Sequence, residues 1–116
     1  MERERIRART TMTNPVADKT DLLARLRANA ESIRACGVER LELFGSFVRG
    51  EAGPESDVDF VVEFRTGEKT YDHLLDLGDL LEEILQRRVE LLTRESLSPY
   101  IGPRILAEVE GVALGS

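Results

Sequence analysis

The chain has 116 residues, of which 41% are hydrophobic and 33% are charged, a balance typical of one soluble globular domain. Its formal net charge of −6 argues against a general nucleic-acid binder, which needs a net basic face, so we expect no direct contact with nucleic acid. No apolar run approaches the roughly 18 residues that a bilayer span needs, so we expect no membrane association. No apolar segment follows the charged N-terminus as in a secretory signal, and Cys36 has no second cysteine to pair with. These features fit a reducing compartment and predict a cytoplasmic protein.

Residues 1–18 alternate arginine with glutamate and then pass through a polar stretch without apolar periodicity. We interpret them as a flexible N-terminal arm. Residues 19–112 are predicted to form a single domain without internal repeats, and residues 113–116 form a short tail.

The first half of the domain predicts a helix and then a strand. Apolar residues recur at helical spacing from Asp21 to about Cys36, after an N-cap at Asp18 or Thr20, and Gly37 is placed to end this helix. Alternating residues over 40–44 then predict a strand that ends at a Gly-Ser turn.

The second half predicts further strands and helices in alternation. A short helix is predicted from Ser46 to about Arg49, and a second strand over 57–64 follows a polar loop. A long helix over about 70–86 and a third strand over 88–92 come next. The last helix is predicted over about 100–110, with Ile101, Ile105, Leu106 and Val109 facing inward.

Acidic residues stand on two of the predicted strands. Side chains at i and i+2 of a strand share one face, so Asp57 and Asp59 are expected to project together beside the Gly-Ser turn. Glu90 is flanked by apolar residues in the third strand, where a buried charge would need a partner or a metal; alternatively, it faces water from an edge strand. If the second and third strands are neighbours, all three carboxylates converge.

This arrangement suggests phosphoryl-transfer chemistry. Adjacent carboxylates repel each other, which raises a pKa or calls for a cation, and oxygen ligands suit Mg²⁺. Two Mg²⁺ ions held by such carboxylates stabilise the attacking and leaving oxygens of an in-line displacement. We therefore take Asp57, Asp59 and Glu90 as candidate catalytic and metal-binding residues.

The Gly-Ser turn supplies the candidate phosphate-binding residues Gly45, Ser46 and Arg49. The Ser46 hydroxyl and the N–H groups that open the short helix could bind a triphosphate, and Arg49 could neutralise phosphate charge or form an ion pair with the acidic loop. Taken singly, a Gly-Ser at a helix start is usually only a cap, so it is the joint pattern that is specific.

The chain contains the segment Gly45-Ser46-x-x-Arg49-Gly50, then five residues, and then Ser56-Asp57-x-Asp59-x-x-Val62. This pattern closely resembles the signature of the minimal nucleotidyltransferases. These belong to the DNA polymerase beta-like nucleotidyltransferase superfamily, and the resemblance covers about residues 20 to 110. It implies an α+β fold with a small mixed β-sheet packed by helices on one side.

The resemblance also implies two Mg²⁺ ions and transfer of a nucleoside monophosphate from ATP or another nucleoside triphosphate. Ser46 would match the family's triphosphate-binding serine, and Asp57 and Asp59 its first two metal ligands. Glu90 falls where the family usually has a third aspartate, a departure that bears on metal geometry and activity.

Chains of this size are similar to the antitoxin half of HEPN–MNT toxin–antitoxin pairs. That similarity implies transfer of AMP to a tyrosine of a HEPN-type RNase toxin. Two other readings stay open: a catalytically weak or inactive transferase fold that neutralises its partner by binding, and a small-molecule (antibiotic) nucleotidyltransferase. The lone histidine, His73, lacks the companions of a zinc site and is not expected to be catalytic.

Overall fold

Three segments with alternating apolar residues pair into one sheet in the computed structural model, which describes residues 14–114. Its strands are β1 (Val38–Phe44), β2 (Val58–Phe64), β3 (Val89–Thr93) and the short β4 (Glu110–Gly111), in the order β3-β2-β1-β4. β1 runs antiparallel to both β2 and β4, whereas β2 and β3 are parallel. The sheet is therefore mixed.

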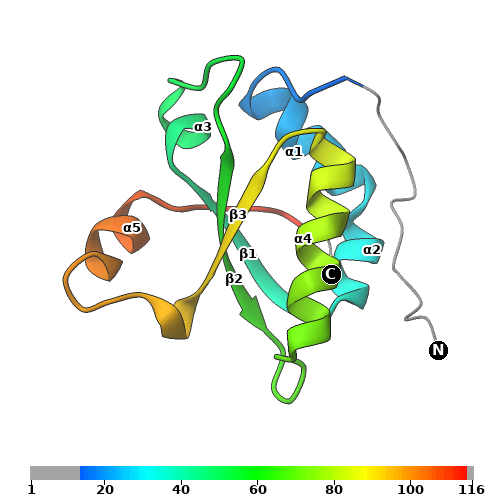
Figure 1. Cartoon of the computed structure of the whole chain (residues 1–116), viewed down its shortest axis with the longest axis vertical. Coiled ribbons are helices and arrows are strands. Elements are labelled where there is room, and N and C mark those ends of the chain that lie inside the picture. Colours follow the sequence, from blue (N-terminus) through cyan, green and yellow to red (C-terminus); the bar gives the residue numbers. More distant parts are fainter. Residues whose placement is uncertain (1–13, 115–116) are drawn as a thin grey trace.

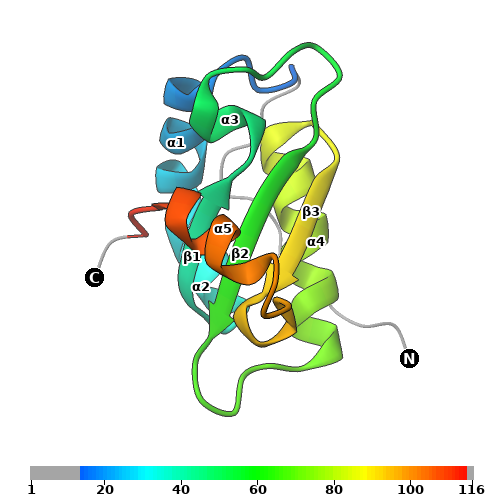
Figure 2. The same cartoon turned by 90° about the vertical axis from the view of Figure 1, so that its left-hand side faces the viewer.

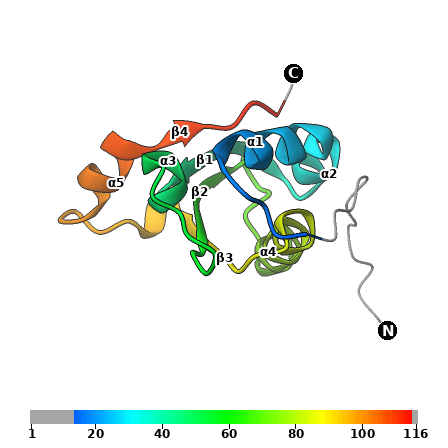
Figure 3. The ribbon, with the colours of Figure 1, turned by 90° about the horizontal axis from the view of Figure 1, so that it is seen from above.

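The helices divide between the two faces of the sheet (Figures 1 and 3). α1 (Lys19–Ala28), α2 (Ala30–Ala35) and α4 (Tyr71–Leu85) pack on one face, and α4 is the crossover that lets β3 lie parallel to β2. The short α3 (Ser46–Arg49) follows β1 directly. A 3-10 turn, η1 (Arg94–Ser96), and α5 (Gly102–Glu108) lie over the opposite face (Figure 2).

The hydrophobic core lies between the sheet and the three helices of the first face. Its largest fully buried side chains come from every layer of this contact: Leu22, Leu26, Ile33, Leu41, Leu43, Phe47, Phe60, Leu77, Leu80, Leu81, Ile84 and Leu85. This arrangement confirms the predicted α+β class and the mixed sheet; the helices that form the core pack on one side, as predicted, while the short α5 and η1 lie on the other.

The predicted helix over 21–36 is wrong in its continuity, because it breaks at Asn29 into α1 and α2. The side-chain amide of Asn29 donates to the carbonyl of Arg25 at 2.9 Å, while its backbone N–H bonds to Leu26 instead. The side chain thus takes the acceptor that the next helical hydrogen bond would use, which is how asparagine interrupts helices.

The prediction for the last helix also needs correction. α5 ends at Glu108, and Glu110 lies in β4, which pairs with β1. Ile101 and Leu106, predicted to face inward, are 54% and 36% exposed. The cause is position: α5 lies over the other face of the sheet, and none of its residues belongs to the buried hydrophobic core (Figure 2).

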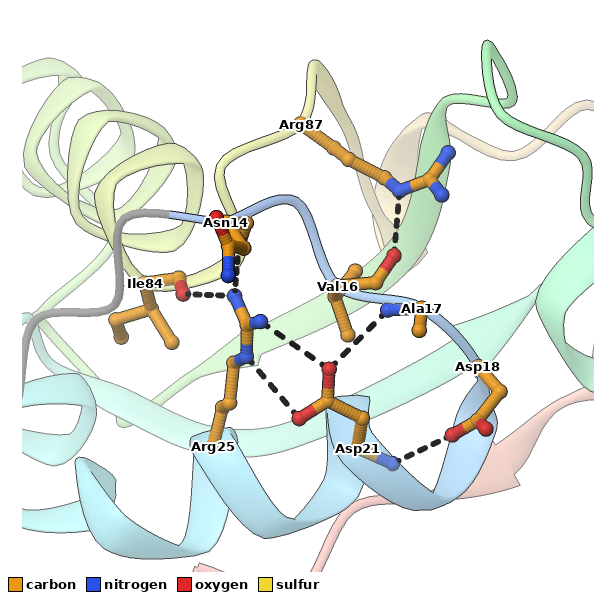
Figure 4. A network of polar contacts seen from close by, with 8 residues as sticks. All are labelled: Asn14, Val16, Ala17, Asp18, Asp21, Arg25, Ile84 and Arg87. Atoms are coloured by element: carbon orange, nitrogen blue, oxygen red, sulfur yellow. Dashed lines mark hydrogen bonds and ion pairs between the residues drawn. The ribbon is translucent and has the colours of Figure 1, made fainter.

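The segment before α1 is fastened to the domain by Arg25, which is only 7% exposed (Figure 4). Its guanidinium donates to the carbonyls of Asn14 at 2.8 Å and Ile84 at 3.1 Å, and it pairs with Asp21. The side chain of Val16 is fully buried in the core.

Packing therefore extends beyond the predicted domain limits of 19 and 112 at both ends, since Leu114 is also buried. Residues 1–13 of the predicted arm and 115–116 of the tail lie outside the described residues. Among residues 14–114, no helix has the length and apolar character that a membrane crossing requires.

One ion pair stabilises the sheet face that carries α5. Glu42 in β1 is 8% exposed and accepts a hydrogen bond from Arg94 Nη2 at 2.8 Å. A carboxylate at this depth depends on its partner, because removing the partner leaves a buried charge unpaired.

We expect Arg94→Met to lower the free energy of unfolding by about 1–3 kcal/mol, because Glu42 would lose its charged hydrogen bond. The double variant with Glu42→Met should recover much of that loss, since two apolar side chains replace the pair. Urea unfolding of the single and double variants measures the coupling, and strictly additive losses would contradict the pair's role.

Candidate active site

The turn after β1 lies directly against the first carboxylate of β2. Phe44 is paired with Asp59 across the two strands, so Gly45 follows at the level of the aspartate. A Cβ added at Gly45 would overlap Asp59 Oδ2, and Gly45 has φ +83°, which L side chains rarely adopt. Both conditions require glycine here, and the sequence motif's two halves thus form one site.

Glu90 reaches the same place from β3. The parallel register sets Asp59 opposite Glu90, and the two carboxyls are close enough for Glu90 to raise the pKa of Asp59. The expectation of a buried charge at Glu90 is wrong, because β3 is the edge strand of the described sheet and Glu90 is exposed. The alternative of an edge-strand glutamate facing water is the one observed. Glu90 nevertheless lies beside Asp59, as we expected if the second and third strands are neighbours.

Asp59 carries the clearest electrostatic signature of the site. Burial raises the pKa of Asp59 from 3.8 to about 6, with further contributions from its hydrogen bond to Glu90 and from the charges of Glu90 and Asp57. Arg49 acts in the opposite direction. The site therefore holds more negative charge than its nearby cation offsets, which favours binding of a further cation.

Asp57 is placed less favourably than predicted. β2 begins at Val58, so Asp57 lies in the preceding loop instead of sharing a regular strand face with Asp59. Within residues 14–114, no three His, Cys, Asp or Glu side chains are grouped closely enough to hold a metal ion. The neighbouring carboxyls of Asp59 and Glu90 supply oxygen ligands of the kind that divalent cations prefer, and Asp57 is near enough for its charge to act on Asp59.

Arg49 and the Gly45 amide contact a glutamate of α5. Glu108 Oε1 accepts from the backbone N–H of Gly45 and from Arg49 Nη1, each at 2.8 Å. Arg49 Nε also donates to Glu51 at 3.2 Å, the ion pair to the acidic loop that the sequence suggested. Arg49 keeps its charge, because the hydrogen bond to Glu51 and the charge of Glu108 raise its pKa.

A groove of about 240 Å³ lies between this turn and α5. It is lined by Phe44, Gly45, Arg49, Ile101, Arg104, Ile105 and Glu108. Two arginines therefore line a groove beside the Asp59 carboxylate, a setting suited to a polyphosphate. Ser46, the first residue of α3, follows Gly45 directly and is partly exposed.

Arg87 connects the loop that carries Asp57 to α3. Its guanidinium donates to the carbonyls of Gly53 at 2.8 Å and Ser56 at 3.0 Å, and it lies 5.1 Å from the ring centroid of Phe47. Arg87 Nε also donates to the carbonyl of Val16 at 2.8 Å (Figure 4). Arg87 thus contacts both Ser56, which precedes Asp57, and Phe47, which follows Ser46.

His73 and Cys36 lie away from this site. His73 Nδ1 bonds to the carbonyl of Glu68 at 2.6 Å and packs near Gly37, which precedes β1, whereas the site follows the end of that strand. Burial raises the pKa of the Cys36 thiol to about 12, with a smaller contribution from Asp76, so the thiol is unreactive.

Sequence reasoning did not identify Glu108, Arg104 or Arg87 as site residues. Glu108 and Arg104 are four residues apart on α5 and so share a helix face, but that spacing alone does not show what the face meets. Arg87 is the first of two arginines before β3. Its guanidinium binds the carbonyls of Ser56 and Gly53, which lie 31 and 34 residues earlier in the chain, so its local sequence does not show this contact.

The small mixed sheet is that of a nucleotidyltransferase fold, and the acidic pair beside a glycine turn and an arginine-lined groove forms its candidate site. The chain belongs to the family described as nucleotidyltransferase domain, whose model matches residues 23–110. It is an enzyme of this family, as predicted, and the family generally uses a divalent metal.

Several curated relatives are similar to it in sequence. A protein of Methanocaldococcus jannaschii, provisionally named a protein adenylyltransferase, is 42% identical over 76 residues, covering 66% of this chain and 81% of the relative. The protein adenylyltransferase MntA of Thermococcus cleftensis is 40% identical over 73 residues, covering 63% of this chain and 73% of the relative.

Solved structures agree with the fold. One described provisionally as a minimal nucleotidyltransferase superposes with a TM-score of 0.63 at 34% identity, covering 76% of this chain and 93% of that one. A toxin–antitoxin structure with AMP-PNP superposes with a TM-score of 0.60 at 18% identity, covering 83% and 73%. The second likeness shows the fold alone.

We expect Gly45→Ala to destabilise the domain by about 1–3 kcal/mol, because the added Cβ meets Asp59 and the backbone keeps φ +83°. Gly53→Ala is the matched control in the same motif, since the nearest atom to its Cβ would be Ser56 Oγ at 4.0 Å. Thermal melts of both variants test this, and equal melting temperatures would contradict the close approach.

We expect Asp59→Asn to stabilise the metal-free protein at pH 7.5 but not at pH 3.5. The pKa of Asp59 rises from 3.8 to about 6 on folding, so the aspartate's stability contribution is present below pH 4 and lost as the pH rises through 6. The gain should be only about 1 kcal/mol, because solvent screens a half-buried group.

Urea unfolding in EDTA at the two pH values measures this difference. Asp18→Asn, at the N-cap of α1, is a control that removes another aspartate and leaves a side chain that can still cap the helix. A stabilisation by Asp59→Asn that is equal at both pH values would contradict the assigned cause.

Proposed function

We propose that this enzyme transfers a nucleoside monophosphate, AMP from ATP, to a protein hydroxyl, a tyrosine of a HEPN-type RNase toxin, and so acts as an antitoxin. The observation that carries the proposal is the meeting of the Gly45 turn with the Asp59–Glu90 pair. Support comes also from relatives named as protein adenylyltransferases and from the fold shared with a toxin–antitoxin structure that holds AMP-PNP.

The arginines and the turn would bind the triphosphate. Arg49 and Arg104 line the groove and can donate to phosphate oxygens, as can the Gly45 amide and the Ser46 hydroxyl. Asp59 and Glu90, with Asp57 beside them, would hold two Mg²⁺ ions, which supply charge stabilisation at the reacting phosphate.

The reaction needs one base and a good leaving group. The acceptor oxygen attacks the α-phosphorus and forms a new P–O bond, while the bond between the α-phosphorus and the oxygen bridging to the β-phosphate breaks and releases pyrophosphate. Glu90, exposed at the edge of the sheet, is placed to accept the hydroxyl proton.

A macromolecular acceptor suits the shape and charge of this chain. The groove between the turn and α5 lies at the surface, with Arg49 and Arg104 exposed, so an acceptor carried by another molecule can approach it. Residues 14–114 form one small domain (Figure 1). The net charge of −6 favours encounter with a basic, RNA-handling partner.

The direct test is transfer of label. The chain is incubated with Mg²⁺, each of the four α-labelled nucleoside triphosphates in turn, and a HEPN-type protein as the candidate acceptor. We expect label from ATP on a partner tyrosine, located by peptide mass spectrometry, and none with Asp57→Asn/Asp59→Asn. Absence of transfer from all four nucleotides would overturn the proposal.

We expect Glu90→Gln to lower the transfer rate by about 10²-fold, because the amide can neither accept the proton nor supply a full charge. Glu90→Asp keeps the carboxylate and restores the family's usual residue, so its rate should stay within about tenfold of the parent. Single-turnover labelling measures both, and an unimpaired glutamine variant would exclude Glu90 from the chemistry.

A second candidate is neutralisation of the partner by binding without catalysis. It is favoured by glutamate at position 90 and by the absence, among residues 14–114, of a ready group of three metal-binding side chains. Full neutralisation of the partner by Asp57→Asn/Asp59→Asn would favour this candidate, and loss of neutralisation would favour catalysis.

A further inference from the structure

Glu108 occupies the part of the site that the triphosphate would need. One of its carboxylate oxygens accepts both from the Gly45 amide and from the Arg49 guanidinium, at 2.8 Å each. The amide and the guanidinium are 4 residues apart around α3, whereas Glu108 comes from α5, 63 residues beyond Gly45. A distant acidic side chain thus satisfies two donors that the sequence motif assigns to phosphate.

The chemistry of this contact matches that of a phosphate oxygen. A carboxylate and a phosphate both present anionic oxygens that accept charge-assisted hydrogen bonds from backbone amides and guanidinium groups. The Gly45 amide has a single hydrogen, so a phosphate oxygen cannot bind it in this geometry until Glu108 withdraws, and Arg49 Nη1 donates to the same carboxylate oxygen.

Resting on the proposed nucleotide binding, we infer that Glu108 is an internal competitor that sets the affinity of the site for the triphosphate. The carboxylate holds the Gly45 amide and Arg49 in place when no nucleotide is bound. It leaves them when phosphate enters the groove between the turn and α5.

The position of Glu108 allows this exchange. Its side chain is 32% exposed, and α5 has only 7 residues and lies outside the hydrophobic core. Movement of the side chain into solvent therefore disturbs no buried apolar layer. Arg104, one turn earlier on α5, lines the same groove and can pair with the incoming phosphates.

The test measures binding of ATP and of inorganic tripolyphosphate, both with Mg²⁺, by isothermal titration calorimetry. We expect Glu108→Ala to lower the Kd for both by about tenfold, since the donors are freed, and Glu108→Gln to lower it less because the amide oxygen still accepts. A similar decrease in the Kd of tripolyphosphate shows that the phosphates of ATP, and not its adenine, displace the carboxylate.

Glu51→Gln is the matched control. Glu51 also pairs with Arg49, at 3.2 Å, but it makes no contact with the Gly45 amide. Glu51→Gln removes one negative charge beside Arg49, as Glu108→Gln does, but leaves the contact with the Gly45 amide in place. Its effect on the Kd should therefore be clearly smaller than that of Glu108→Gln. An equal gain from Glu51→Gln would mean that general charge, and not occupancy of the site, sets the affinity, and would overturn the inference.

A second readout needs no nucleotide. The Gly45 amide proton should exchange with solvent faster in Glu108→Ala than in the parent, while core amides such as that of Phe60 keep their rates, which also shows that the variant is folded.

The two proposals fail in different ways. Faster Gly45 exchange without triphosphate binding in any variant would overturn the proposed function, and the inference with it. Binding by the parent that is unchanged or weakened in Glu108→Ala would overturn the inference alone.

Discussion

The approach of the Asp59 carboxylate to the α-carbon of Gly45 is the constraint on which the site depends. It requires that β1 and β2 pair in one register, since a shift of one residue would turn Asp59 to the core face. It also fixes the residue at 45, because any side chain would meet the carboxylate. A phosphate-binding turn and an acidic pair are thereby brought into contact by backbone geometry.

The parallel pairing of β3 with β2 adds the remaining acid. α4 carries the chain back across the sheet, so that Glu90 arrives beside Asp59 at the same end. Because β3 is the edge of the described sheet, Glu90 meets Asp59 on one side and solvent on the other. That position suits a group which must exchange a proton with an acceptor brought by another molecule.

The sequence predicted the parts of this site that rest on local rules. Gly45 and Ser46 follow from turn chemistry, and Asp59 and Glu90 follow from strand patterns. The contact of Glu108 with Gly45 was beyond prediction, because the two residues are 63 apart and only tertiary packing joins them. Apolar periodicity predicted one continuous helix, but Asn29 interrupts it, since one side-chain hydrogen bond outweighed a weak helix preference.

The link between Glu108 and Gly45 also has a meaning for biosynthesis. The turn and the acidic pair lie in the part of the chain that ends with β3, whereas the carboxylate that covers the turn comes later in the chain, from α5. A growing chain that extends only through β3 would thus carry the proposed phosphate-binding turn without its covering carboxylate until α5 is added.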